Sequence, residues 1–411
     1  MQTERIYQSD VYCIKTSSSV TEVLTKDGFD VISTARSVFF PEGGGQPSDT
    51  GKVTKGSDTS AVTYVYDEEN GGAVYHVTNA PEGTFAVGDE VELEIDWDNR
   101  FVNMQRHCGE HMVSAAFYSL FNGANKGFHM GENYIAIDID LGGRKLTEEE
   151  IQQAEDLVNK AIRDNLPVTT QFFDSYEEST VLDVRKDSYH EGRISVVTIG
   201  DSENPFDRIG CCGTHPATTS EVGLVAVYRA EMTKGMNRIY FDCGKMALDK
   251  LKNDYDTVYK IACGLSTSIE NLPHKLEVQE AKDSELRARI AGLAAYYKEK
   301  EAERIAAEIE GLRDSQSVFC FDDDLLDVND LLKLGFAVAE DLRENEVLAL
   351  RDTASSTVLL FSDGSVKCGD LVKQNAADFN GKGGGRPDNA RASFDNTKDA
   401  AAFCKALKNL L

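Results

Sequence analysis

The sequence lacks long apolar runs and is poor in positive charge. No apolar run approaches the ~20 residues that span a bilayer, so we expect no membrane partner. The start, Met-Gln-Thr-Glu-Arg-Ile-Tyr, has no basic segment followed by an apolar one, which is unlike a secretory signal. Lys and Arg number 43 against 70 Asp and Glu, and the net charge is −27. Such a chain repels nucleic acid at long range, so a polyanionic partner would need a local basic patch, or metal and backbone contacts.

A disulfide framework is also missing. The nine cysteines are an odd number and are widely scattered, which favours a reduced, cytoplasmic location. A hydrophobic content of 41% and a charged content of 27% are typical of a soluble globular protein. A chain of 411 residues is too long for one core. We therefore expect three or four domains.

Two pairs of metal-binding residue types stand at the same spacing in distant parts of the chain. His107 and His111 lie in a stretch whose apolar pattern predicts a helix from about Trp97 to Leu120 with one buried stripe. Residues four apart share one face of a helix. Cys211 and His215 repeat this separation. The four side chains match the nitrogen and sulfur donors that zinc prefers, which predicts a Zn²⁺ site.

A glycine triplet stands out in the first hundred residues. Gly43, Gly44 and Gly45 follow Ser-Val-Phe-Phe-Pro-Glu and precede Gln-Pro-Ser-Asp-Thr-Gly. Glycines expose backbone N–H groups and let a substrate approach the main chain closely, although a plain hairpin loop is the common alternative. Ser37 and Gln46 flank the triplet with neutral hydrogen-bonding groups that suit an uncharged polar ligand.

These three motifs, in this order, resemble the editing domain of alanyl-tRNA synthetase and its free-standing relatives, the AlaX alanyl-tRNA editing proteins. The resemblance covers roughly residues 1–246. It implies an aminoacyl-tRNA hydrolase that removes wrongly attached serine or glycine from tRNA(Ala). The partner would be tRNA(Ala) mischarged with one of these two amino acids, and the sequence does not decide which is preferred.

The resemblance also assigns roles to individual positions. Gln46 matches a family glutamine near the substrate, and Ser37 falls where many relatives carry a threonine whose hydroxyl could discriminate serine from alanine. Glu110 could orient a ligand or activate water, although a solvated helix carboxylate is more common. The expected site comprises zinc ligands His107, His111, Cys211 and His215, catalytic residues Gln46, Ser37 and Glu110, and substrate-binding residues Gly43, Gly44, Gly45 and Thr214.

Several alternatives remain open within this interpretation. Cys212 stands beside Cys211, and only the spacing favours Cys211 as the ligand. Zinc could polarise water or could only shape the pocket, because four protein ligands are typical of a structural site. The stretch from His107 to His111 also fits the H-x-x-E-H pattern of a zinc metalloprotease with Glu110 as base. A non-catalytic tRNA-binding or assembly protein with structural zinc is the third possibility.

The periodicity predicts an α+β multidomain protein. Residues 1–91 read as short strands of a small β-barrel that carries the glycine-rich loop, and 92–248 as an α/β zinc-binding editing domain with a mostly antiparallel sheet. In that sheet the turn from Cys211 to His215 would join two strands. Residues 249–314 predict a helical hairpin or coiled-coil arm with a break near Pro273 and a repeat at Leu286, Ile290, Leu293 and Tyr297. Residues 315–411 alternate strand and helix again.

The C-terminal region carries a second glycine-rich stretch, in residues 378–391. It resembles one in the C-terminal domain of alanyl-tRNA synthetase, which implies tRNA contact and assembly and points to the long form of AlaX. Its glycines would expose N–H donors, while Lys382, Arg386 and Arg391 supply positive charge in an acidic chain. We expect these three residues to bind tRNA, and a homodimer could form through the arm or this domain.

Overall fold

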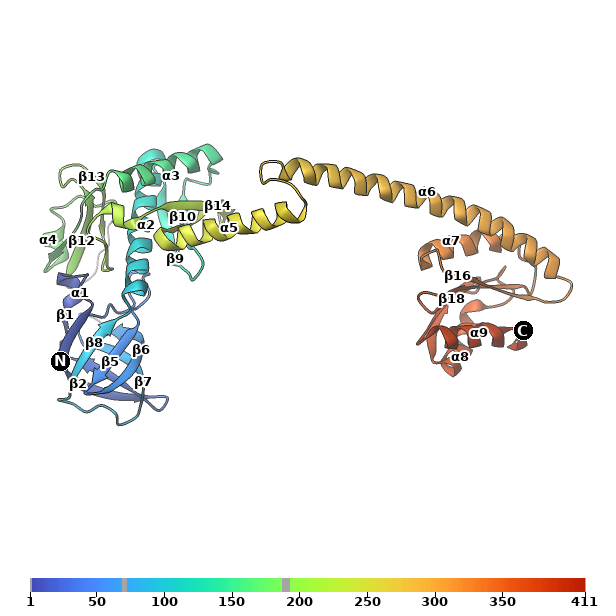
Figure 1. Ribbon diagram of the computed structural model, residues 1–411, viewed down its shortest axis with the longest axis horizontal. Helices are drawn as coiled ribbons and strands as arrows, with labels where there is room; N and C mark the ends of the chain where they lie inside the picture. Colours follow the sequence, from blue (N-terminus) through green and yellow to red (C-terminus); the bar gives the residue numbers. More distant parts are fainter. Residues whose placement is uncertain (1, 69–71, 187–192, 411) are drawn as a thin grey trace. The chain divides into compact units, whose positions relative to one another are not determined.

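The computed structural model describes residues 2–68, 72–186 and 193–410 (Figure 1). The chain divides into two compact units, Met1–Ile261 and Ala262–Leu411. It is a mixed α/β multidomain protein, as the sequence predicts. Among the described helices, none is both long and apolar enough to cross a membrane.

The first unit begins with the predicted β-barrel. Its strands are joined by antiparallel ladders in the closed order β2-β3-β7-β6-β5-β8. Val53, Val62 and Leu93 are among the residues that fill its core. The strand bounds are β2 (Lys15–Lys26), β3 (Phe29–Thr34), β5 (Gly51–Lys55), β6 (Asp58–Asp67), β7 (Val74–Pro81) and β8 (Glu90–Ile95), preceded by β1 (Glu4–Arg5) and α1 (Ile6–Ser9) and with β4 (Arg36–Ser37) paired to β1.

The long helix α2 (Trp97–Phe121) follows the barrel, close to the predicted bounds. The carboxylate of Asp96 caps its first turn by accepting a hydrogen bond from the Asn99 amide. At its other end Asn122 takes up the left-handed conformation of a helix C-cap. The prediction of a single buried stripe is wrong, because every residue from Asn103 to Phe117 is buried. Over these residues the helix is enclosed by other parts of the unit.

Two antiparallel sheets surround α2 where the sequence predicted one. The first has the order β14-β15-β10-β9 and the second the order β11-β12-β13. The turn that carries Cys211 and His215 therefore leaves the second sheet and leads toward the first, instead of joining two strands of one sheet. The elements are β9 (Ala124–Met130), β10 (Ile135–Asp140), α3 (Glu148–Arg163), β11 (Val168–Phe173), α4 (Tyr176–Ser179), β12 (Ile194–Gly200), β13 (Pro205–Gly210), η2 (Thr219–Val222), β14 (Val225–Thr233) and β15 (Met236–Cys243).

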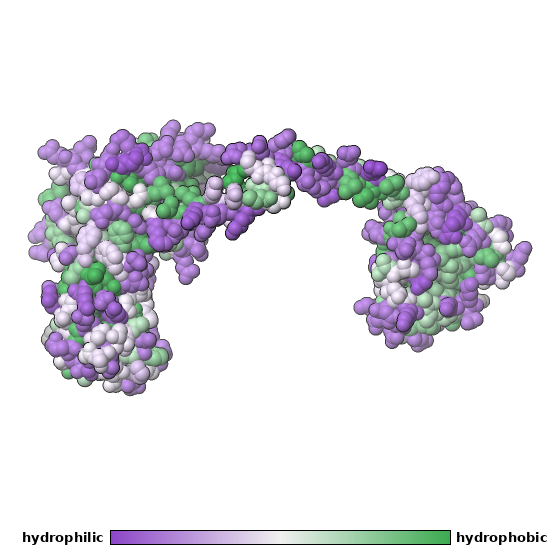
Figure 2. All heavy atoms as spheres, in the orientation of Figure 1, coloured by the Kyte–Doolittle hydropathy of each residue, from purple (hydrophilic) through white to green (hydrophobic). Residues whose placement is uncertain are grey.

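Two helices follow, α5 (Gly244–Gly264) and α6 (Leu272–Leu312). Pro273 lies in the first turn of α6, so the predicted break is confirmed. Ile305 and Ile309 pack into the core of the second unit. Earlier in α6, apolar side chains reach the surface (Figure 2), and Leu286, Ile290 and Leu293 are among the exposed ones.

The second unit contains a sheet with the order β16-β17-β18-β20-β19. Part of the glycine-rich stretch forms the edge strand β19, in which Gly383 and Gly385 lie opposite Ala392 and Ala390 of β20. Because the amide of Arg386 donates to the carbonyl of Asn389, the antiparallel register directs the N–H groups of these two glycines away from β20. A Cβ on either glycine would lie within 2.3 Å of a β20 backbone oxygen. The elements are β16 (Val318–Asp323), α7 (Val328–Ala339), β17 (Val347–Asp352), β18 (Thr357–Phe361), α8 (Cys368–Asn375), η3 (Ala376–Phe379), β19 (Gly381–Gly385), β20 (Asn389–Phe394) and α9 (Thr397–Leu410).

A fully buried ion pair joins the barrel to α2. Arg100 of α2 contacts Asp49, which lies three residues after Gln46, and both side chains have no exposed area. The Arg100 Nε donates to Asp49 Oδ1 at 2.9 Å, and its Nη2 donates to the carbonyl of Val38 at 2.7 Å. Asp49 also accepts the amide N–H of Phe40 at 2.6 Å. The pair fixes the segment that carries the glycine triplet against α2.

We expect Arg100→Met to destabilise the first unit by about 3–5 kcal/mol, because it leaves the Asp49 carboxylate buried without its partner. The chain's single tryptophan, Trp97, lies at the start of α2 and reports the transition by fluorescence in a urea titration of the whole chain. The matched control is Arg144→Met, which removes a pair to Glu150 whose arginine side chain is 47% exposed and should change stability little. Equal midpoints for the two variants would contradict the role given to Arg100.

Candidate functional site

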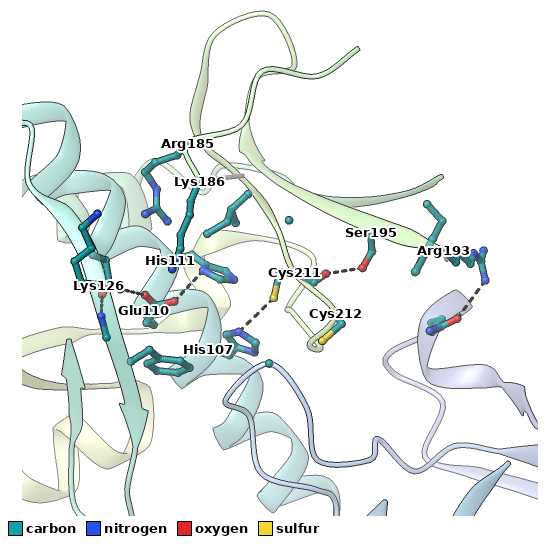
Figure 3. A pocket seen from close by; sticks show the side chains of 18 residues that line it. His107, Glu110, His111, Lys126, Arg185, Lys186, Arg193, Ser195, Cys211 and Cys212 are labelled. Atoms are coloured by element: carbon teal, nitrogen blue, oxygen red, sulfur yellow. Dashed lines mark hydrogen bonds and ion pairs between the residues drawn. The ribbon is translucent and has the colours of Figure 1, made fainter. Parts of the chain in front are cut away.

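The two predicted donor pairs meet in the structure. His107 and His111 lie one turn apart on α2, and Cys211 and His215 lie on the turn after β13 (Figure 3). One donor atom from each of the four lies within 4.8 Å of the others. The Sγ of Cys211 is 3.3 Å from Nε2 of His107. A cation could therefore be held by three nitrogens and one sulfur.

The surroundings of the cluster fit a metal ion. Both ring nitrogens of His215 and Nε2 of His111 are buried and have no hydrogen-bond partner among the residues that the structure describes. An unpaired buried polar group costs about 1–3 kcal/mol, which a metal ion would recover. Burial tends to raise the pKa of the Cys211 thiol, but the three histidines hold that pKa well below its usual value. The thiolate, which is the metal-binding form, is thus favoured.

Gln46 supports this cluster from the barrel side. Its side chain is fully buried, and its Oε1 accepts from Nδ1 of His107 at 2.8 Å and from the Thr214 amide at 3.0 Å. Its Nε2 donates to the Thr214 hydroxyl at 2.8 Å. Because Nδ1 of His107 carries the proton, Nε2 is unprotonated and its lone pair faces Cys211. Gln46 thus orients a candidate ligand, and its catalytic role stays a prediction.

Glu110 occupies the corresponding place beside His111. Its Oε2 lies 2.9 Å from Nδ1 of His111, and its Oε1 accepts from Ser114 at 2.7 Å and from Asn125 at 2.8 Å. Burial alone would raise the pKa of the Glu110 carboxyl, but His111, followed by Ser114, lowers it to about 2. Both oxygens are engaged by protein groups, so the geometry suits an orienting carboxylate better than a general base.

The glycine triplet forms a tight turn next to the cluster. Gly43 and Gln46 exchange two backbone hydrogen bonds, and both Gly44 and Gly45 have positive φ values. A Cβ on Gly44 would lie 3.0 Å from the Sγ of Cys212. Gly44 is the member of the triplet that lines the adjoining cavity. The turn thus allows close approach, as expected, while two of its N–H groups are used internally.

Ser37 is not brought to the cavity. Its hydroxyl is fully buried in the barrel, 2.8 Å from Nε2 of His76, and accepts the Phe39 amide at 3.1 Å. Nδ1 of His76 donates a hydrogen bond to the carbonyl oxygen of Ile32 at 3.1 Å. Burial lowers the pKa of His76 to about 4, so the ring is neutral and Nε2 accepts from Ser37. In this structure both of these hydrogen bonds of the Ser37 hydroxyl are made within the barrel.

Cys212 lines the cavity but lies outside the donor cluster. Burial and the neighbouring Cys211 raise the pKa of its thiol to about 11. The geometry therefore favours Cys211 over Cys212 as a ligand, in agreement with the spacing.

A cavity of about 590 Å³ opens directly above the cluster. Its lining contains four cationic side chains and a single carboxylate, that of Glu110; the cations are Lys126, Arg185, Lys186 and Arg193 (Figure 3). Arg185 is neutralised by Asp207 at 2.8 Å. Within the described ranges, no carboxylate forms an ion pair with Lys126, Lys186 or Arg193. The sequence analysis missed this basic lining, although Arg185-Lys186 is a basic pair in an acidic chain.

The three C-terminal cations are accessible. Lys382 on β19, Arg391 on β20 and Arg386 between the strands are all exposed. The ladder places Gly384 opposite Arg391, so Lys382 and Arg391 lie on adjacent positions of one sheet face. They form a candidate anion-binding surface of the second unit, whereas the histidine cluster belongs to the first.

Three family models match parts of the chain. The model described as tRNA synthetases class II (A) matches residues 3–99, and that of the threonyl and alanyl tRNA synthetase second additional domain matches residues 194–240. The DHHA1 domain model matches residues 337–411. The matched regions contain the barrel, the Cys211–His215 turn and half of the second unit.

Individual relatives agree with these models. The alanyl-tRNA editing protein AlaX-L of Pyrococcus horikoshii is 34% identical over 251 residues, which are 60% of this chain and 60% of that protein. Alanine–tRNA ligases of Methanobrevibacter smithii and Pyrococcus abyssi are 25% and 27% identical over 94% and 100% of this chain, but the matches span only 43% and 44% of those enzymes. The chain thus spans less than two thirds of the length of each. It is related to the alanyl-tRNA editing proteins and to the corresponding part of the alanine–tRNA ligases.

Proposed function

We propose that this chain hydrolyses the aminoacyl ester of tRNA(Ala) that carries serine or glycine. The observation that carries the proposal is the opening of a three-histidine, one-cysteine cluster into a cation-lined cavity in a chain of net charge −27. A cationic lining suits the phosphates near the 3′ end of an RNA. The relative at 34% identity is an alanyl-tRNA editing protein.

An aminoacyl ester is already activated, so hydrolysis requires a positioned water, stabilisation of the developing oxyanion and exclusion of larger acyl groups. We assign a bound Zn²⁺ to His107, His111, Cys211 and His215; zinc would fix the four side chains in one geometry beside the cavity. Four protein donors fill a tetrahedral shell. We therefore infer that the chain's own cavity groups and the terminal ribose of the RNA position the water.

Each polar residue then has a defined task. Gln46 and Glu110 hold the rings of His107 and His111, and Thr214 ties Gln46 to the turn that carries His215. Gly44 lets the acyl group approach the main chain without a side chain between. Lys126 and Lys186 line the cavity and attract the phosphates.

The metalloprotease alternative finds little support in this geometry. That pattern needs a glutamate free to act as base and a distal carboxylate as third ligand. Glu110 is held by His111, Ser114 and Asn125, and the further donors in the cluster are a cysteine and a histidine. A non-catalytic RNA-binding protein with a structural metal is the stronger second candidate, because four protein donors leave no open position.

We expect Cys211→Ser to lose most of its bound zinc and its deacylation of Ser-tRNA(Ala) and Gly-tRNA(Ala), because the thiolate donor is removed from a buried site. Cys212→Ser, one residue away, is the matched control and should keep both. Elemental analysis by mass spectrometry and release of radiolabelled amino acid measure the two properties. Zinc-loaded wild-type protein that deacylates neither substrate would favour the non-catalytic alternative, and full activity in metal-free Cys211→Ser would remove zinc from the account.

We expect Gln46→Ala to weaken zinc affinity or activity by about 10–100-fold, the usual cost of losing a group that orients a metal ligand. The exposed Gln152, which hydrogen-bonds only to Asp156 on its own helix among the described contacts, provides the control Gln152→Ala. Competition with a chromophoric chelator gives the affinities. Equal values for Gln46→Ala and Gln152→Ala would show that the His107 contact is dispensable.

The C-terminal contact is a separate proposal. We expect the double change of Lys382 and Arg386 to alanine to weaken tRNA binding and to reduce the slope of log affinity against log salt by about one for each phosphate that is no longer neutralised. Lys398 and Lys405 of α9 are also exposed, so their double alanine variant controls for net charge. Filter binding at several salt concentrations measures both. The same weakening in both variants would assign the effect to overall charge and not to the β19 surface.

A further inference from the structure

A second hollow of about 520 Å³ adjoins the cavity above the histidine cluster. Gln8, Phe172 and Arg193 line both hollows, so the two share one border. This border is called the Phe172 saddle below. Resting on the proposed function, we propose that the Phe172 saddle binds the unpaired nucleotides that precede the terminal adenosine of the RNA.

The saddle is built from three segments of the first unit, of which α1 contributes Gln8. Phe172 lies on β11, where it pairs with Ser195 of β12, and Arg193 immediately precedes β12. The Ser195 hydroxyl donates to the carbonyl of Cys211 at 2.6 Å. The saddle is therefore connected to the metal-binding turn through one residue. In Figure 3, Arg193 lies on the opposite side of Cys211 from Lys126.

The chemistry of the saddle suits single-stranded nucleic acid. The Arg193 guanidinium lies 4.3 Å from the ring centroid of Phe172, and its Nη1 donates to the Gln8 Oε1 at 3.2 Å. Unpaired bases stack on aromatic rings and on guanidinium planes, and a nearby cation holds the backbone phosphate. Arg5 in the second hollow is matched by Asp67 at 2.7 Å. Among the described residues, the hydrogen bond of Arg193 to the neutral amide of Gln8 is its only polar side-chain contact.

The position of the Phe172 saddle beside the cavity also supports the proposal. The acyl group must reach the small cavity beside Gly44, and the nucleotides before it must leave that cavity along a surface that tolerates negative charge. The second hollow continues from the cavity across the saddle. A stacked base at Phe172 would hold the strand at the saddle and so contribute to binding.

The test uses the whole chain and a fluorescein-labelled single-stranded RNA ending in ACCA, followed by anisotropy. We expect Phe172→Ala to bind about tenfold more weakly, since stacking contributes roughly that factor or more per base. Phe172→Tyr should bind like wild type, and Arg193→Gln should bind more weakly with a smaller salt slope. Phe29→Ala and Arg144→Gln are the controls, because Phe29 is 44% exposed at a strand end of the barrel and Arg144 is exposed.

A kinetic comparison separates the saddle from the function. For mischarged tRNA, Phe172→Ala should raise KM with little change in kcat, whereas hydrolysis of a seryl ester of adenosine, which lacks the preceding nucleotides, should be unchanged. If all variants bind the RNA like wild type, the saddle proposal is overturned even when deacylation is normal. If Phe172→Ala binds more weakly but wild-type protein deacylates nothing, the saddle stands and the proposed hydrolase activity fails. Unaltered zinc content in Phe172→Ala, together with retained binding by Phe172→Tyr, excludes misfolding.

Discussion

The side-chain amide of Gln46 connects three separate parts of the first unit. It belongs to the segment after the barrel's glycine turn, it accepts a hydrogen bond from His107 of α2, and it holds Thr214 beside His215 by two further bonds. A Cβ on Gly213 would lie 2.2 Å from the His107 ring, so the turn lies directly against that histidine. The two donor pairs converge because the buried Gln46 amide hydrogen-bonds to His107 of the first pair and to Thr214, the neighbour of His215 in the second.

Contacts from the barrel segment therefore hold the cluster in position. Arg100 and Asp49 bind the same segment to α2 about two turns before His107. An unpaired charge at this depth would be strongly destabilising, so Arg100 and Asp49 remain in contact with each other. With α2 and the barrel fixed, Gln46 can select one tautomer of His107. The position of the donor cluster relative to the basic cavity follows from these two buried contacts.

The sequence predicted the parts of the fold that depend on local periodicity. The barrel strands, the bounds of α2 and the break at Pro273 follow from alternation, helix spacing and proline geometry. Helix spacing alone places His107 and His111 on one face, but their meeting with Cys211 and His215 came from the donor types and the resemblance. Local patterns did not reveal that strands β9 to β15 form two separate sheets. They also did not reveal that part of the second glycine-rich stretch is the edge strand β19. Those outcomes depend on pairing between distant segments.

The directions of individual side chains at the site could not be predicted from the sequence. Ser37 and Gln46 flank one turn, yet one points into the barrel toward His76 and the other toward His107. The basic lining was missed because Lys126, Arg185 and Arg193 come from different strands and loops, and only folding gathers them.

X-ray absorption at the zinc edge of the zinc-loaded protein tests the central claim most directly. The account predicts one sulfur at about 2.3 Å and three nitrogens at about 2.0–2.1 Å; a shell with two sulfurs, or with none, would contradict it.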